Sequence, residues 1–204
     1  MAGFTRAFLG LVVIAALLAS VLFLLIRGRG FSAREEPGGI EAAVALRLRS
    51  VMTPRSARDL RNPVAPTPEA IRAALEHYAD HCAVCHANDG SGNTDMGRGL
   101  YPRPPDLRLP RTQSLADGEL FYIIEEGIRF TGMPGWGNGT AEGETASWQL
   151  VQFIRHLPRL SEGERQAMEQ LNPRSPDEIR QEIEEERFLS GRDAPNRRPP
   201  PHRH

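Results

Sequence analysis

The chain has 204 residues, a formal net charge of −1 and 40% hydrophobic residues, a length that suits one ordinary domain with extensions. All 25 basic residues are arginine, and residues 67–160 carry eight arginines against twelve carboxylates, a local net charge of −4. No basic face is therefore indicated, and the composition argues against a nucleic-acid-binding protein.

Residues 7–26, AFLGLVVIAALLASVLFLLI, contain no charged side chain. Twenty residues at 1.5 Å each match a hydrocarbon core of about 30 Å. A cleaved signal peptide has a shorter apolar core and a small-x-small cleavage site, but this run ends in RGRG. We therefore expect an uncleaved transmembrane anchor at 7–26 that follows a short segment at 1–6, with a cleaved signal as the alternative. Arginines on both sides leave the orientation open.

Residues 27–66 are predicted to form a linker with one short amphipathic helix. Apolar side chains recur at helical spacing in its middle, at Ile40, Val44, Leu48 and Val51. Several prolines then interrupt the segment that follows.

Residues 67–160 are expected to form the main helical domain. Thr67 and Pro68 begin a first helix that runs to about His81. The segment 87–113 is rich in Gly and Pro and predicts a long loop without regular structure. Ser114 is expected to cap a second helix that ends near Gly127, and a third helix is expected over 144–157.

Residues 161–190 predict a helical acidic extension. Two capping boxes mark the starts of its helices, Ser161 with Glu164 and Ser175 with Glu178. Residues 191–204 have little to bury and are expected to be a disordered tail. No strand pattern is found, so the sequence predicts an all-α protein.

The only two cysteines lie in the segment CAVCH, residues 82–86. A structural zinc site needs four ligands, a thioredoxin-type dithiol needs a strand before it, and a disulfide here would close a very small ring. Covalent attachment of haem is the fourth use, and Cys-x-x-Cys-His is its signature. Both thiols then add to the porphyrin vinyl groups, and His86 lies under the iron.

A second iron ligand is expected later in the chain. Met133 lies 47 residues beyond His86 in the Gly-rich segment FTGMPGWG. Met96 is the main competitor, and the remaining histidines are interpreted as surface, cap or structural residues: His77, His81, His156, His202 and His204.

From Pro68 to Leu160 the chain resembles the class I c-type cytochromes, small all-helical proteins that carry one haem. The resemblance rests on the CAVCH motif, the order of the elements, and Met133 followed by proline. It implies one haem c held by Cys82 and Cys85, with His86 as the proximal and Met133 as the distal iron ligand.

The resemblance also implies a packing pattern. The family's first helix crosses its last, which would bring Tyr78 against Phe153 with the small Ala74 beside them. A loop with Pro102, Pro104 and Pro105 resembles the family's proline loop, one of whose carbonyls accepts the second N–H of the proximal histidine.

These residues predict a membrane-anchored, mono-haem electron carrier without enzymatic activity of its own. Histidine and methionine together leave no open position on the iron and suit electron transfer. By the resemblance, the haem domain lies in the periplasm of a bacterium, which places residues 1–6 in the cytoplasm. The domain is expected to exchange single electrons with respiratory partners at the membrane, without nucleic acid or a small-molecule substrate. The alternatives are a dedicated subunit of a dehydrogenase or oxidase complex and a haem sensor or peroxidase.

Overall fold

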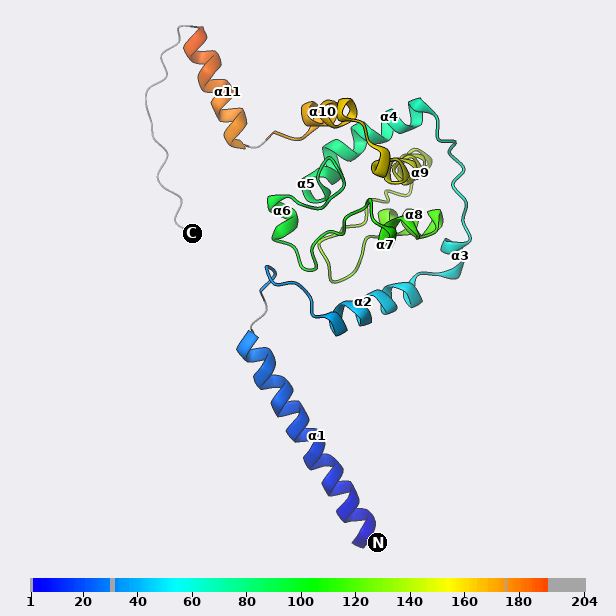
Figure 1. Cartoon of the computed structure of the whole chain (residues 1–204), viewed down its shortest axis with the longest axis vertical. Coiled ribbons are helices and arrows are strands. Elements are labelled where there is room, and N and C mark those ends of the chain that lie inside the picture. Colours follow the sequence, from blue (N-terminus) through cyan, green and yellow to red (C-terminus); the bar gives the residue numbers. More distant parts are fainter. Residues whose placement is uncertain (1, 30–31, 175, 191–204) are drawn as a thin grey trace.

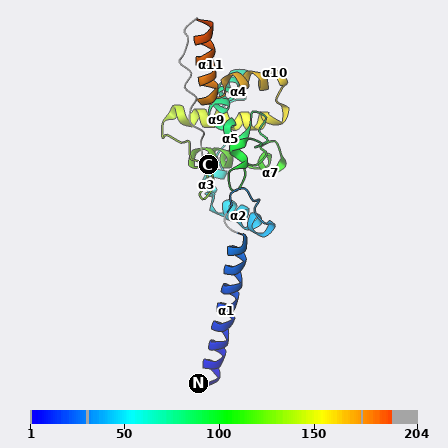
Figure 2. The ribbon, with the colours of Figure 1, turned by 90° about the vertical axis from the view of Figure 1, so that its left-hand side faces the viewer.

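The computed structural model describes residues 2–29, 32–174 and 176–190, and within these ranges it forms helices and no strand. The all-α prediction is therefore confirmed. One long helix, α1 (Ala2–Arg29), extends away from a body of shorter helices (Figures 1 and 2). Its segment Arg6–Leu25 is long and apolar enough to cross a membrane, and none of it is buried. The predicted tail at 191–204 and the cap residue Ser175 lie outside the described residues.

The other elements follow in chain order (Figure 1). They are α2 (Gly39–Met52), α3 (Arg55–Arg58), α4 (Pro68–His77), the π-helical turn η1 (Tyr78–Cys82), α5 (Ala83–His86), α6 (Asp95–Arg98), α7 (Pro110–Gln113), α8 (Asp117–Glu126), α9 (Ala141–His156), the 3₁₀ turn η2 (Leu157–Arg159), α10 (Glu162–Leu171) and α11 (Pro176–Leu189).

The core forms where α4 and η1 cross α9. The α4 helix begins as predicted, because the Thr67 side chain accepts a hydrogen bond from the Ala70 nitrogen at 3.2 Å and Pro68 occupies the first turn. At the crossing, Ala74 is buried and the Tyr78 ring lies 5.0 Å from the Phe153 ring. The packing implied by the resemblance is confirmed.

Several expected boundaries differ from the structure, among them the start of the third helix, which lies at Ala141 and not at 144. Ser114 does not cap the second helix, because residues 110–113 form their own turn, α7, and Ser114 ends it. The α8 helix starts three residues later, where Glu119 accepts a hydrogen bond from the Ala116 nitrogen. The loop predicted over 87–113 likewise contains two short helices, α6 and α7.

The end of the predicted linker packs on the body. Ala57 of α3 is buried, and α3 contacts α8. The Asn62 amide donates to the Trp148 carbonyl at 2.9 Å, and the Gln152 amide donates to the Val64 carbonyl at 2.7 Å. These contacts fix residues 57–64 against the helices that follow them in sequence.

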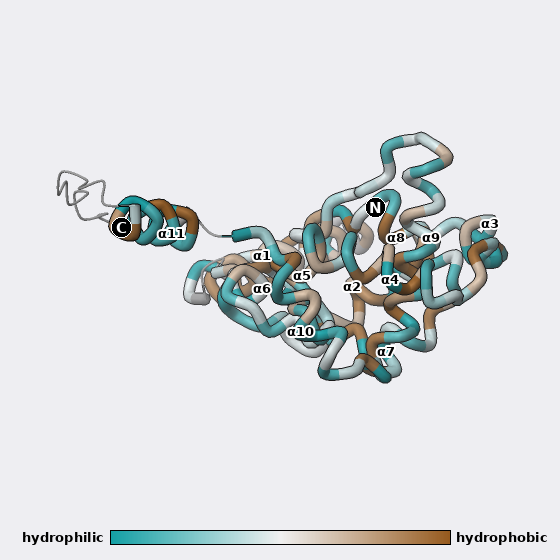
Figure 3. Tube along the Cα trace, turned by 90° about the horizontal axis from the view of Figure 1, so that it is seen from above, coloured by the Kyte–Doolittle hydropathy of each residue, from teal (hydrophilic) through white to brown (hydrophobic). Residues whose placement is uncertain are grey.

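The two C-terminal helices differ in their packing. The predicted capping box of Ser161 and Glu164 is present at the start of α10, and α10 packs on α4 and η1 with Met168 fully buried. The α11 helix lies apart from the body (Figures 1 and 3). Its described side chains are exposed.

Candidate functional site

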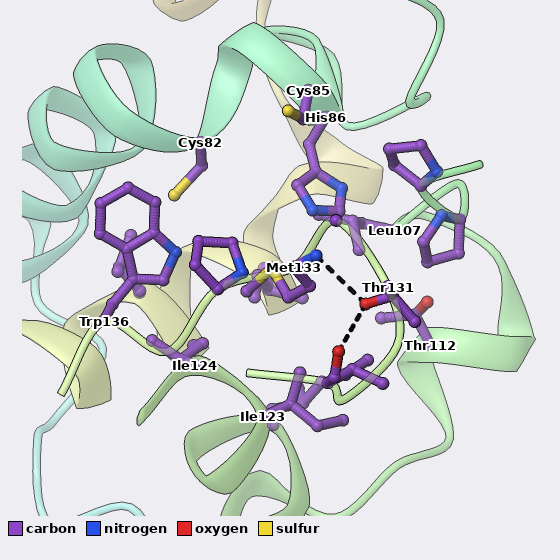
Figure 4. A pocket seen from close by; sticks show the side chains of 18 of the residues that line it. Cys82, Cys85, His86, Leu107, Thr112, Ile123, Ile124, Thr131, Met133 and Trp136 are labelled. Atoms are coloured by element: carbon purple, nitrogen blue, oxygen red, sulfur yellow. Dashed lines mark hydrogen bonds between the residues drawn. The ribbon is translucent and has the colours of Figure 1, made fainter. Parts of the chain in front are cut away.

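The body encloses a pocket whose lining includes Cys82, Cys85, His86 and Met133 (Figure 4). Its empty space, counted with the open mouth, is about 1110 Å³. The other lining side chains are mainly apolar and come from several elements, among them Leu107, Leu120, Ile123, Ile124, Leu150 and Ile154.

The cysteines reach this pocket because the helix before them changes its winding. After α4 the chain passes through the π turn η1, which ends at Cys82, and then through the short helix α5. Such π turns occur often at functional sites. Both cysteines are free thiols, so the structure contains no disulfide between them. Burial raises the pKa of Cys82 to about 12, which keeps this thiol protonated at neutral pH.

His86 ends α5 and lies inside the pocket. The backbone turns sharply after it, since Ala87 has a positive φ of 62°, and the Tyr78 hydroxyl donates to the Ala87 carbonyl at 3.1 Å. Burial lowers the pKa of His86 to about 4, so its imidazole is neutral and has a lone pair for a metal. Figure 4 shows the ring pointing from α5 toward Met133.

The proline loop lies beside this histidine. Pro102, Pro104 and Pro105 all line the pocket. The buried Nδ1 of His86, however, has no hydrogen-bond partner among the described residues. The resemblance implied a hydrogen bond from this imidazole to a carbonyl of the loop, and the structure does not contain it.

Met133 is positioned by a tight loop between α8 and α9. Its nitrogen donates to the Thr131 hydroxyl at 3.1 Å, and its carbonyl accepts from the Ile128 nitrogen at 3.0 Å. The Thr131 hydroxyl in turn donates to the Ile128 carbonyl at 2.7 Å. These bonds hold the Met133 side chain in the pocket, opposite the motif on η1 and α5 (Figure 4).

The competing ligands lie elsewhere, with one exception. Met96 is 55% exposed and does not line the pocket. His156 bonds Glu164 at 2.8 Å, outside the pocket. His81 does belong to the lining, where its ring lies 5.4 Å from that of Trp136. His77 is not in the lining, and His202 and His204 lie outside the described residues.

Two residues of the pocket lining, Trp136 and Arg49, were not predicted from the sequence. Trp136 was passed over although it lies only three residues beyond Met133. Arg49 comes from α2, inside the segment that was expected to be a linker. The sequence held no signal for it, because Arg49 lies on the side of α2 opposite the apolar residues at 40, 44, 48 and 51, where a solvent-facing side chain is expected.

The donor set of the pocket fits one haem attached through its edge. Two free thiols lie near a buried neutral imidazole, and a thioether enters from the Met133 loop. Largely apolar walls suit the flat porphyrin, and soft sulfur and imidazole donors suit its iron.

A comparison with known families agrees with this fit. Residues 69–154 match the family model described as cytochrome c oxidase, cbb3-type, subunit III. The chain contains a c-type cytochrome domain. The domain binds haem c covalently, with its iron, and its role is electron transfer. No curated protein matches the chain.

The family match leaves several elements of this cytochrome unaccounted for. It begins inside α4 and ends inside α9, so α1 to α3, α10 and α11 lie outside it. What these elements add must be inferred from the structure itself.

Proposed function

We propose that this protein is a membrane-anchored cytochrome that transfers single electrons between respiratory partners. Cys82 and Cys85 hold the haem covalently, His86 is the proximal iron ligand and Met133 is the distal one. The observation that supports this most strongly is that all four side chains line the same pocket. When bound, haem c supplies a centre that gains and loses one electron at a time.

The residues of the pocket suit this task. An imidazole and a thioether together fill both axial positions, and a methionine ligand raises the reduction potential relative to two nitrogen ligands. The neutral state of His86 and the hydrogen-bonded Met133 loop favour binding with little rearrangement. The mainly apolar walls exclude water from the site. These features favour a carrier over an enzyme that needs an open iron position.

We also propose that α1 anchors the protein in a bacterial cytoplasmic membrane with its N-terminus inside. Haem is attached to c-type cytochromes outside this membrane, so the body then lies in the periplasm. The apolar segment Arg6–Leu25, which is long enough to cross a membrane, supports the anchor. Tethering raises the effective concentration of the cytochrome at neighbouring membrane complexes. We keep the domain division of the sequence analysis, with the haem domain over 67–160 and an acidic extension over 161–190.

The ligand assignment is tested by comparing Met133→Ala with Met96→Ala as a matched control. Both variants remove one thioether from a Gly-containing segment, but only Met133 lines the pocket. We expect the oxidised wild type and Met96→Ala to show the weak sulfur-to-iron absorption band, and Met133→Ala to lack it. A band that persists in Met133→Ala would contradict the assignment. If the wild type itself lacks the band and binds carbon monoxide readily, a sensor or peroxidase role replaces the carrier.

A second candidate is a dedicated subunit of an oxidase or dehydrogenase complex. The description of the matched family, an oxidase subunit, favours it. Purification in mild detergent distinguishes the two: a free carrier leaves the membrane alone, whereas a subunit elutes with its complex.

A further inference from the structure

Arg49 is an unexpected member of the pocket lining. It is one of two arginines there, and it comes from α2, outside the segment that matches the family model. The last turn of α2 is closed by Thr53, a buried residue that donates to the Arg49 carbonyl through both its nitrogen at 3.0 Å and its hydroxyl at 2.9 Å. Arg49 therefore reaches the pocket lining from the capped end of α2.

The charges around Arg49 leave it without an anionic partner. Within the described residues, its guanidinium has no hydrogen bond or ion pair. Its electrostatic neighbours are Arg111, which repels it, and Glu119, which attracts it. Glu119 is already engaged, since Arg58 lies 3.4 Å away and the Ala116 nitrogen donates to it at 3.1 Å. A half-buried cation in this position favours an anion in the pocket.

The second arginine of the lining has partners of its own. The Arg103 guanidinium lies 3.3 Å from a Glu36 carboxylate oxygen. The loop of Arg103 also touches α2, because the Tyr101 hydroxyl donates to Glu41. Of the two lining arginines, Arg49 is thus the one without an anionic partner among the described residues. The contact between Tyr101 and Glu41 helps to keep α2 against the body.

The structure of haem c indicates where its anionic groups would lie in the pocket. The porphyrin carries two carboxylates on the edge opposite the two vinyl groups that react with cysteines. Cys82 and Cys85 lie on the η1 and α5 side of the pocket, whereas α2 lies on the other side of the body from α4 and α5 (Figures 1 and 2). A haem tied to the cysteines therefore extends its carboxylates toward the side from which Arg49 enters.

We propose that Arg49 binds a haem carboxylate, so that α2, the helix next to the membrane anchor, completes the cofactor site. This inference rests on the proposed haem attachment at Cys82 and Cys85. A guanidinium next to a carboxylate forms a charge-assisted hydrogen bond and favours its ionised form. The contact places the Arg49 guanidinium against the carboxylate edge of the haem. Because Arg49 belongs to α2, the contact links the helix next to the membrane anchor with the cofactor.

The test is the pH dependence of the reduction potential in the full-length haem-loaded protein. Arg49→Gln removes the charge, and Arg47→Gln is the control, because Arg47 is exposed and lies about 200° away around the same helix. We expect the potential of Arg49→Gln to fall, since a lost positive charge favours oxidised iron. We also expect its carboxylate-linked pH step to move up by about 1–3 units. Arg47→Gln should match the wild type.

A third variant guards against a general loss of structure. Arg49→Lys keeps the charge and should return the pH step close to its wild-type position. Hydrogen exchange along α2 reports whether the helix stays docked. An unchanged pH step in Arg49→Gln overturns the inference, even if α2 loses protection, because Arg49 would then only hold the helix. A wild type without covalent haem would instead overturn the proposed function, and this inference with it.

Discussion

Gly127 lies where the loop that carries Met133 folds back on the end of α8. Its φ is +70°, a conformation that favours glycine. A Cβ atom at this position would lie 2.5 Å from both the Gly135 nitrogen and the Pro134 carbonyl carbon, and 2.7 Å from the Met133 carbonyl oxygen. Because glycine has no Cβ atom, residues 133–135 can approach Gly127 closely enough to bring Met133 into the pocket.

We predict that Gly127→Ala displaces the Met133 loop. The new methyl group collides with backbone atoms that cannot rotate away, so residues 133–135 must shift. The sulfur-to-iron band of the oxidised protein should weaken or disappear, and absorption spectroscopy measures it.

Gly139→Ala is the matched control for this substitution. Gly139 has almost the same φ, +71°, but its Cβ would meet no atom within 4 Å. Gly139→Ala should therefore lower the free energy of unfolding only by the cost of the left-handed conformation, about 1–2 kcal/mol. The sulfur-to-iron band should remain unchanged. Equal spectra for the two variants would show that close packing at Gly127 does not position Met133.

At this scale, local motifs were easier to predict than partners distant in sequence. CAVCH is contiguous, so the sequence alone could bring Cys82, Cys85 and His86 together as a hypothesis. Arg49 could not be found this way, because its place beside the pocket depends on how α2 docks 33 residues before Cys82.

Among the elements, α10 is part of the core although it follows the matched domain. Met168 is fully buried in the cluster that contains Tyr78 and Phe153. The helix is fixed at its start by the Ser161 capping box and by the bond from His156 to Glu164. The helix therefore covers α4 and η1, which lead into the cysteine motif.

We predict that Met168→Ala lowers the free energy of unfolding by about 2–5 kcal/mol, because it leaves a cavity under α10. Chemical denaturation of the full-length protein in detergent measures it. The control is Gln170→Ala on the exposed side of the same helix, which should change stability by less than about 0.5 kcal/mol. Similar values for the two variants would mean that α10 does not contribute to the core.

Two side-chain-capped helix starts were predicted well, whereas the start of α9 was predicted three residues late although the Thr140 side chain caps it. Thr67 and Ser161 both accept the expected hydrogen bonds. Ser114 has the same chemistry, but the preceding residues form α7 and leave it at the end of that turn. The π turn η1 was also missed, since nothing in the spacing of residues 78–82 distinguishes it from a continued α-helix.

For the whole molecule, the segment between anchor and haem domain is more than a tether. The α2 helix lies between α1 and the body (Figure 2), with Arg49 toward the pocket and its apolar residues, such as Ile40 and Val44, exposed. Farther along, residues 57–64 bond to α9 through Asn62 and Gln152. The body is thereby held close to the end of α2.

The all-α architecture could be predicted from composition and periodicity. The packing of the C-terminal helices in residues 161–190 could not. The apolar run at 7–26 and the helical patterns suffice for an all-α protein with one long N-terminal helix. Nothing in the acidic composition of residues 161–190 separates the docked α10 from the exposed α11. In the structure, α10 buries Met168 and bonds to His156 through Glu164, whereas the described side chains of α11 are exposed.

The intact mass of the denatured full-length protein tests the central claim most directly. The protein is made in a host that matures c-type haem, beside the double variant Cys82→Ser/Cys85→Ser as control. We predict that the wild-type chain retains the mass of one haem after denaturation and that the double variant does not. A wild-type chain that loses all haem on denaturation, or a double variant that keeps it, would contradict covalent attachment at this motif.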